Sequence, residues 1–337
     1  MAPAQVTPSV AKPVDPVEVI ADAFRTHVIV ALGNIEFAGN EQGHAFQVSL
    51  LRDPRISSVV DDIVVEFGDA RYQDVIDRFT RGEDVAYASL RHVWQDTTQV
   101  EFIWDLPIYE DFFRAVRQVN ASLPRAHRLR VLLADPPIDW ATVRSREDVQ
   151  KYALQRDAYA VDLIRREVLA RKHRALLVYG TQHLVRKNVI AGAADESAPG
   201  IVALLEKDKA TQVFSVLPAT RRDLNALQGD IGTWPIPSLA LLRGTVLGAA
   251  LWDSDARKRP VRIEDQFDAL LYLGPPTSMT MSRLAPALCA DPEYMQMRLG
   301  RLALLAPPPG ARFTPADQLK QYCAQAATAK KADVPNP

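Results

Sequence analysis

The sequence predicts an α/β protein in three layers, with a mainly parallel central sheet covered by helices on both faces. Three unbroken apolar runs favour this fold: Val28–Gly33, Val131–Ala134 and Ala175–Tyr179. Runs of this kind suit strands that are buried on both faces, as in a parallel sheet. Long helical patterns separate the runs, and strands that alternate with helices favour parallel pairing.

The first half of the chain alternates strand and helix clearly. Proline ends two of the helices, at Asp53-Pro54 and at Pro124, because it cannot continue a helical ladder. The predicted strands are His27–Gly33, Asp62–Phe67 and Arg130–Asp135. The predicted helices are Glu18–Arg25, Glu41–Leu51, Tyr72–Thr80, Val85–Trp94 and Ile108–Leu123. The helices between about residues 72 and 123 form an insertion before the third strand.

The second half begins with the longest predicted helix, Asp148–Lys172, which leads into the strand Ala175–Tyr179. Residues Gln228–Gly244 are rich in glycine and proline, so a loop with a short helix is expected there. The remaining predicted strands are Thr211–Leu217 and Phe267–Leu273, and the remaining helices are Ile201–Lys207 and Asp291–Leu304. One α/β domain over residues 18–305 is expected, between a flexible arm (1–17) and a partly mobile tail (306–337).

Composition narrows the class of protein. Hydrophobic residues make up 47% of the 337 residues, charged residues 24%, and the net charge is -1. This is the balance of a globular protein, and without a long run of one charge it does not indicate a nucleic acid partner. No apolar stretch reaches the roughly 18 residues of a membrane span. The expected partner is a small-molecule ligand or substrate, and the oligomeric state stays open.

The sequence determines neither the cellular compartment nor the pairing of the two cysteines, and the second depends on the first. The first residues lack the apolar core of a secretory signal, which favours the cytoplasm unless a signal peptide has been removed. Cys289 and Cys323 are too few for a disulfide framework or a metal cluster. A bond between them is expected only in an exported protein.

Polar residues follow the predicted strands where each one ends. Asn34 and Glu36 follow the apolar run of the first strand, Glu66 that of the second and Asp135 that of the third, and His183 lies just beyond the fourth. Ligands of open α/β sheets bind beyond the carboxyl ends of the strands, so these side chains are site candidates. Motifs for dinucleotide binding, P-loop nucleotide binding, zincins and serine hydrolases of the G-x-S-x-G type are absent from the sequence.

The order of these fragments resembles a known superfamily. LGNIE, VVEFG, QRDAYA and VYGTQH occur along residues 28–184. This series resembles the erythromycin esterase, ChaN-like and TIKI/TraB superfamily, which carries a G-E-x-H motif after its first strand. The resemblance implies an erythromycin-esterase/ChaN-like sheet with its site at the carboxyl ends of the strands. It assigns Glu66 to the second-strand carboxylate, Arg156-Asp157 to the helix pair and His183 to the late histidine.

The first strand departs from that pattern, because Asn34 and Glu36 stand where the superfamily has glutamate and histidine. Glu36 is then a candidate base or oxygen ligand. The predicted catalytic residues are Glu66, His183 and Glu36, which are also the candidate ligands of a divalent metal. The predicted substrate-binding residues are Arg156, Asp157, Asn34, Asp135, Gln73 and His92.

The same candidate site residues could instead have structural roles. Glu66 could pair with a structural arginine such as Arg156, and His183 could simply cap the next helix. Three hypotheses follow: a hydrolase in which Glu66 and His183 activate water, a binding protein for an anionic ligand such as haem on a degenerate site, and an interaction protein. The cofactor is not identified by the sequence.

Overall fold

The computed structural model describes residues 8–34, 39–187, 200–219, 231–252, 261–305 and 314–328. Its centre is a seven-stranded sheet in the order β3-β2-β4-β1-β5-β9-β6. All neighbouring strands are parallel except β6, which is antiparallel to β9. The strands are β1 (Ile29–Asn34), β2 (Asp62–Asp69), β3 (Arg130–Asp135), β4 (Ala175–Gly180), β5 (Val213–Pro218), β6 (Ser238–Leu241) and β9 (Ala269–Tyr272). The predicted three-layer α/β fold is confirmed.

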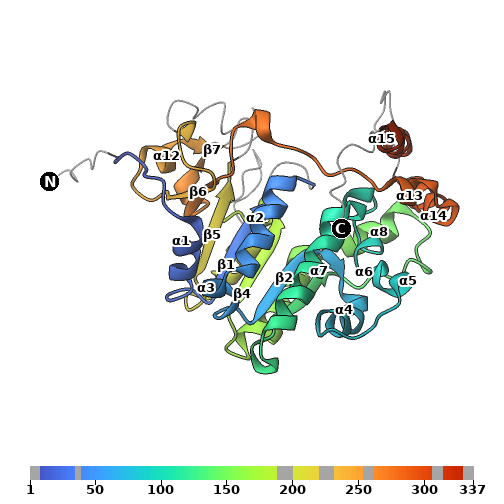
Figure 1. Cartoon of the computed structure of the whole chain (residues 1–337), viewed down its shortest axis with the longest axis horizontal. Coiled ribbons are helices and arrows are strands. Elements are labelled where there is room, and N and C mark those ends of the chain that lie inside the picture. The colour runs from blue at the N-terminus through green and yellow to red at the C-terminus, as the bar shows by residue number, and fades with distance from the viewer. Residues whose placement is uncertain are drawn as a thin grey trace.

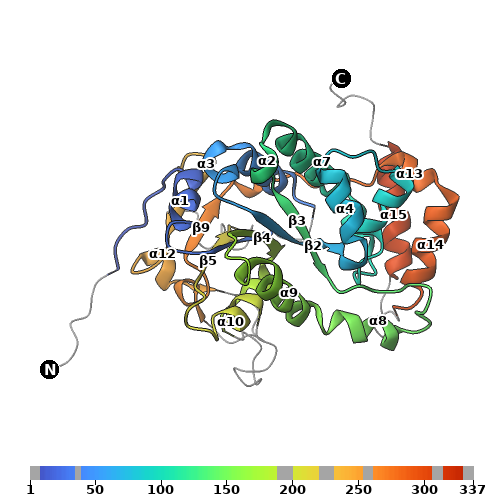
Figure 2. The ribbon, with the colours of Figure 1, turned by 90° about the horizontal axis from the view of Figure 1, so that it is seen from below.

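Helices cover both faces of this sheet, as Figure 2 shows from below. One face carries α1 (Pro16–Ala23), α2 (Glu41–Arg52), α3 (Pro54–Ser57) and α7 (Pro107–Ser122). The other face carries α9 (Arg156–Ile164) and α10 (Ile201–Leu205). Successive strand residues alternate between two buried clusters, one under each helical layer. The apolar runs read from the sequence are therefore buried on both sides.

The remaining helices extend the sheet at its two ends (Figure 1). Beyond β3 lie α4 (Gln73–Thr80), α5 (Tyr87–Leu90), α6 (His92–Gln95), α8 (Arg146–Ala153), α13 (Pro286–Ala290), α14 (Pro292–Leu302) and α15 (Pro315–Thr328). Near β6 lie α12 (Val246–Ala249) and a small hairpin of β7 (Leu251–Trp252) and β8 (Val261–Arg262). A disulfide between Cys289 and Cys323 joins α13 to α15. The pairing left open by the sequence is thus present in the structure.

Three predicted elements are wrong in part. The loop prediction for Gln228–Gly244 missed β6, a four-residue strand whose apolar core is too short to stand out among glycines and prolines. The helix Val85–Trp94 is two short helices, α5 and α6. The long helix Asp148–Lys172 is interrupted at Leu154-Gln155, so α9 starts at Arg156 and ends in a π-helical turn. Leu154, at this break, is 86% exposed, so its apolar side chain does not pack against the core.

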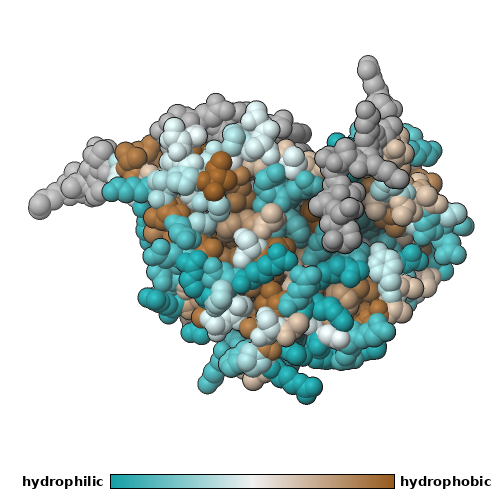
Figure 3. Space-filling model, viewed as in Figure 1, coloured by the Kyte–Doolittle hydropathy of each residue, from teal (hydrophilic) through white to brown (hydrophobic). Residues whose placement is uncertain are grey.

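The two ends of the predicted domain also contain ordered structure. Within the predicted arm, the amide of Ser9 bonds the carbonyl of Gly244, and Val14 pairs with Leu239 of β6. Within the predicted tail, residues 315–328 form α15. In the described residues, no helix combines the length and the apolar character needed to cross a membrane. The face in Figure 3 mixes hydrophilic and hydrophobic residues.

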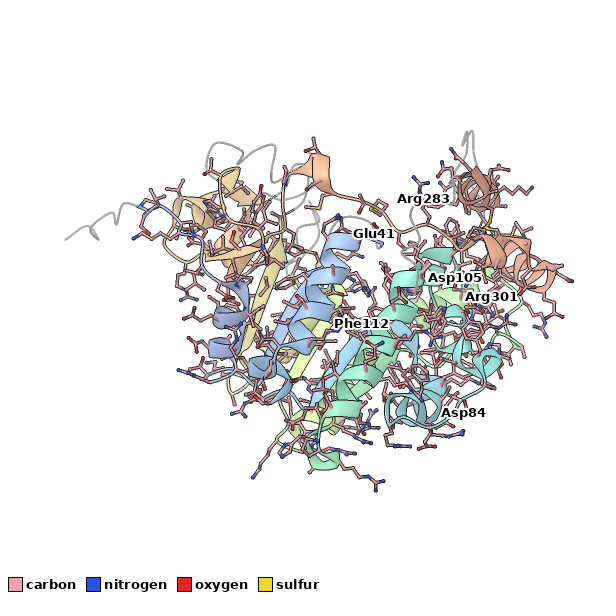
Figure 4. The ribbon with its side chains drawn as sticks, in the orientation of Figure 1. Glu41, Asp84, Asp105, Phe112, Arg283 and Arg301 are labelled. Atoms are coloured by element: carbon pink, nitrogen blue, oxygen red, sulfur yellow. A yellow bond between two sulfur atoms is a disulfide. The ribbon has the colours of Figure 1, made fainter. Side chains whose placement is uncertain are left out.

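Phe67 anchors the aromatic cluster between β2 and α7. Its ring lies 4.8 Å from that of Tyr109, 5.4 Å from Phe112 and 5.5 Å from Phe113, centroid to centroid. Figure 4 labels Phe112 on α7. Because Phe67 directly follows Glu66, this packing fixes the strand beside a candidate site residue.

We expect Phe67→Ala to lower the free energy of unfolding by about 3–5 kcal/mol, because the cavity left at a buried aromatic side chain collapses only in part. Urea unfolding monitored by circular dichroism measures the change. Leu154→Ala, at a side chain that is 86% exposed, is the control and should change the value by less than about 0.5 kcal/mol. Equal effects of the two substitutions would contradict this account of the core.

Candidate active site

Glu66 and His183 meet at the carboxyl ends of neighbouring strands. Glu66 lies near the end of β2, and His183 lies in the 3-10 turn Thr181–Leu184 that directly follows β4. Because β2 and β4 are parallel neighbours, their carboxyl ends open on the same edge. The Gly180 amide donates to Oε2 of Glu66 at 2.7 Å. A Cβ at position 180 would lie 3.2 Å from that oxygen, so glycine allows the close approach.

His183 is held between two carboxylates. Its Nε2 lies 3.2 Å from Oε1 of Glu66, and its Nδ1 lies 2.6 Å from Oδ1 of Asp157. Asp157 stands in the first turn of α9, which begins at the break after α8. The helix interruption therefore brings the Arg156-Asp157 pair over the carboxyl edge of the sheet. Both groups are largely buried, with 16% of the His183 side chain and 8% of the Glu66 side chain exposed.

These contacts determine the protonation states of His183 and Glu66. Burial alone would lower the pKa of His183, but the hydrogen bonds to Asp157 and Glu66 outweigh it and raise the pKa to about 10. Burial alone would raise the pKa of Glu66, but His183, the Gly180 amide and Arg156 hold it below its ordinary value. At neutral pH the group is an imidazolium between carboxylates.

Arg156 and Asp135 form a second cluster at the same edge. Nε of Arg156 lies 3.3 Å from Oδ1 of Asp135, at the end of β3. Thr98 joins them: its hydroxyl lies 2.6 Å from Asp135 Oδ1 and accepts a 2.6 Å bond from Nε of Arg156. Gln99 accepts from Nη1 of Arg156 at 3.2 Å. Burial raises the pKa of Asp135 to about 6, although Arg156 and Thr98 oppose the shift.

The segment that carries Thr98 and Gln99 is fixed by α14 from far along the chain. Arg298 is 1% exposed, pairs with Asp105 at 2.7 Å and donates to the carbonyls of Gln95 and Val100. Arg301 pairs with Asp96 at 2.5 Å and also donates to Gln95. Figure 4 labels Asp105 and Arg301 near one another at the α14 end of the molecule. Buried charges of this kind require partners, so the segment is held on both sides.

Asn34 lies at the same edge but on the α2 side. Its Oδ1 accepts a 2.9 Å bond from Gln47 of α2, and its carbonyl accepts from the Thr181 hydroxyl at 2.9 Å. It lines a narrow pocket together with Gly39, Asn40, Gly43, His44, Gln47, Phe67, Ile108, Tyr109 and Phe112. Burial lowers the pKa of His44 to about 4, so its imidazole is neutral at pH 7. The sequence pattern around His44 gives no sign that this side chain borders a pocket.

The other predicted substrate-binding residues make contacts within the protein. The amide of Gln73 donates to the carbonyl of Val131 at 2.7 Å and accepts from the amide of Leu133 at 2.9 Å. These bonds fix α4 against the middle of β3. His92 lies 2.8 Å from Asp96 and stacks on Tyr72. Glu36 lies outside the described residues.

Asp69 at the end of β2 was not predicted, because the apolar pattern of the strand stops at Phe67. It is fully buried and pairs in register with Asp135 of β3. Its Oδ1 accepts from the amide of Arg71 at 2.7 Å, whereas Oδ2 has no partner in the described structure. Burial, together with the charges of Asp135 and Asp96, raises the pKa of Asp69 to about 8. A carboxyl group that keeps its proton at pH 7 thus stands at the carboxyl edge.

The metal hypothesis needs a complete set of donors. Within the described ranges, no group of three or more His, Cys, Asp and Glu side chains is arranged to hold a metal ion. Both ring nitrogens of His183 already contact carboxylates, so a metal at His183 would have to replace one of them. The described residues alone therefore do not form a metal centre.

Comparison with solved structures identifies known proteins of similar fold. Neither a family model nor a curated protein sequence matches the chain. Among solved structures, a succinoglycan biosynthesis protein has 8% identity and a TM-score of 0.61, over 81% of this chain and 96% of its own. A Bacillus cereus protein has 11% identity and a TM-score of 0.55, over 82% and 96%. A mutant of the erythromycin esterase EreC has 12% identity and a TM-score of 0.53, over 79% and 94%. The chain therefore shares an erythromycin-esterase-like α/β fold, and identities this low carry the likeness no further than the fold.

The charge of His183 can be measured directly. We expect the ¹⁵N shifts of its ring to titrate with a midpoint of about 10, and Asp157→Asn to lower that midpoint by removing one carboxylate. Because the pKa is raised from 6.5, the stabilisation is complete below about pH 6.5 and is lost as the pH rises through about 10. Asp162→Asn, at an exposed carboxylate on the same helix, should leave the midpoint unchanged. A wild-type midpoint near 6.5 would disprove the ion-paired arrangement.

Proposed function

We propose that the protein is a hydrolase in which Glu66 activates water and His183 and Arg156 stabilise the charge that develops on the substrate. The observation that carries the proposal is the Asp157–His183–Glu66 chain of contacts at the carboxyl edge of the sheet. A carboxylate beside a charged imidazole in a largely buried position is an arrangement suited to acid-base chemistry. The erythromycin-esterase-like fold supports the same reaction class by analogy.

Glu66 is the base in this proposal because His183 already carries its proton. Each oxygen of Glu66 accepts one bond from the protein, from His183 or from Gly180, and keeps a second lone pair for a water molecule. Glu66 would take a proton from that water as it attacks a carbonyl carbon. The positive charge of His183 would stabilise the negative oxygen, and the proton that Glu66 took from water would pass to the leaving group, which restores Glu66 as a carboxylate.

Arg156 would orient the substrate. Its Nε and Nη1 are held by Thr98, Asp135 and Gln99. No bond from its Nη2 occurs within the described residues, so this nitrogen is free to bind a carbonyl or carboxylate oxygen. The proposed reaction uses only Glu66, His183 and Arg156.

Glu66→Gln tests the base. We expect the substitution to reduce hydrolysis of activated esters by about 10²–10⁴-fold, because an amide cannot accept the proton from water. A panel of p-nitrophenyl esters, lactones and peptides, assayed with purified protein, measures the rate. Glu18→Gln, at an exposed glutamate in the first turn of α1, is the matched control and should keep the wild-type rate. Equal rates for Glu66→Gln and wild type would rule out Glu66 as the base.

One observation favours a second function, a binding protein for a small anionic ligand. Both nitrogens of His183 and both oxygens of Glu66 already contact the protein, and Asn34 stands where an acid is expected. On this alternative Arg156 would hold the ligand and no ester of the panel would be cleaved by wild-type protein. Calorimetric titration with small carboxylates would then show binding that Arg156→Gln removes. Hydrolysis lost in Glu66→Gln would decide against this alternative.

A further inference from the structure

A hollow lined largely by arginines lies at the amino end of β3. Arg130 begins this strand and Asp135 ends it, so the hollow is at the opposite edge of the sheet from the candidate active site. It has a volume of about 460 Å³. Its lining residues are Asp77, Thr80, Arg81, Glu83, Arg125, Arg128, Leu129 and Arg130.

Both carboxylates of the hollow are already paired. Asp77 lies 3.2 Å from Arg130, which also pairs with Glu167 at 2.8 Å. Glu83 lies 3.1 Å from Arg78 and 3.3 Å from Arg81. Asp77 and Glu83 are therefore already bound by other arginines, and within the described residues neither of them pairs with Arg125 or Arg128.

Arg125 and Arg128 are left without a carboxylate. Arg125 is exposed and makes no hydrogen bond or ion pair within the described residues. Arg128 donates Nη1 to the carbonyl of Arg81 at 3.1 Å, a bond that holds its position without neutralising its charge. The wall beside them is held by Arg117, which donates to the carbonyls of Phe79, Gly82 and Glu83. Two unmatched guanidinium charges thus line one hollow with a fixed wall.

We propose that this hollow binds a phosphate group in its dianionic form. The two unmatched charges equal the charge of a phosphate monoester or of inorganic phosphate above its second pKa. Guanidinium groups present parallel N–H donors that match phosphate oxygens. The buried side chain of Leu129 lowers the local dielectric on one side, which strengthens the attraction. The site is independent of the proposed hydrolase.

Titration with inorganic phosphate at about pH 7.5 and low ionic strength tests this site, because the dianion predominates there. Arginine Nε–Hε resonances report which guanidinium groups bind. We expect saturable shifts at Arg125 and Arg128, and a dissociation constant at least roughly ten-fold larger in Arg125→Ala. Arg125 is exposed and unpaired, so this substitution should leave folding intact. Arg25→Ala is the control, because Arg25 is exposed and paired with Asp22 elsewhere on the surface.

A second experiment distinguishes a lipid headgroup from a free phosphate compound as the bound phosphate. Co-sedimentation with phosphatidylcholine vesicles, with and without phosphatidic acid, asks whether a lipid headgroup fills the hollow. Binding to phosphatidic acid that Arg125→Ala weakens would support the site and assign it to a headgroup, and saturation by inorganic phosphate alone would assign it to a free phosphate compound. Shifts that do not saturate, or that are as large at Arg25, would show charge screening only and overturn the proposal. An unchanged dissociation constant in Arg125→Ala, or no response to either probe, would do the same.

Discussion

The carboxyl edge of the sheet is arranged around one buried negative charge, that of Glu66. A carboxylate out of water needs donors and an opposite charge, and here the Gly180 amide, His183 and Arg156 supply them. Gly180 offers its amide because it has no side chain to keep Glu66 away. The turn after β4 positions His183. The helix that begins after Leu154 positions Asp157, which contacts His183. The parallel pairing of β2 with β4 makes all of these contacts compatible.

Two largely buried arginines of α14 hold the neighbouring segment 95–105 in place. Arg298 and Arg301 of α14 contact Gln95 in this segment from 203 and 206 residues further along the chain. Removing one partner of a fully buried pair such as Arg298–Asp105 typically costs about 3–5 kcal/mol, because the other charge is left uncompensated. The segment in turn positions Thr98 between Asp135 and Arg156. The C-terminal helices are therefore part of the architecture of the candidate site.

The sequence predicted correctly those strands and helices that are uniformly buried. Strands such as β4 have apolar runs between clear breakers, whereas β6 is four residues long and lies among glycines and prolines. Glu66 and His183 could be paired from the sequence because Glu66 directly follows an apolar run, His183 lies in the turn beyond another, and parallel strands share an edge. Thr98 and Arg298 could not, since their roles depend on tertiary contacts that leave no periodic pattern. The position of His44 beside a pocket could not be predicted either, because a half-buried histidine on a helix has the same local pattern whether or not a pocket lies beside it.

The disulfide between Cys289 and Cys323 spans 34 positions of the chain and encloses α14. A protease that cut the backbone anywhere inside that ring would not release a fragment, because the sulfur bridge would still join the two pieces. Such a nicked molecule would migrate as one band in a non-reducing gel and separate into two only after addition of thiol. The arginines of α14 could thus stay in place in a chain that is no longer continuous.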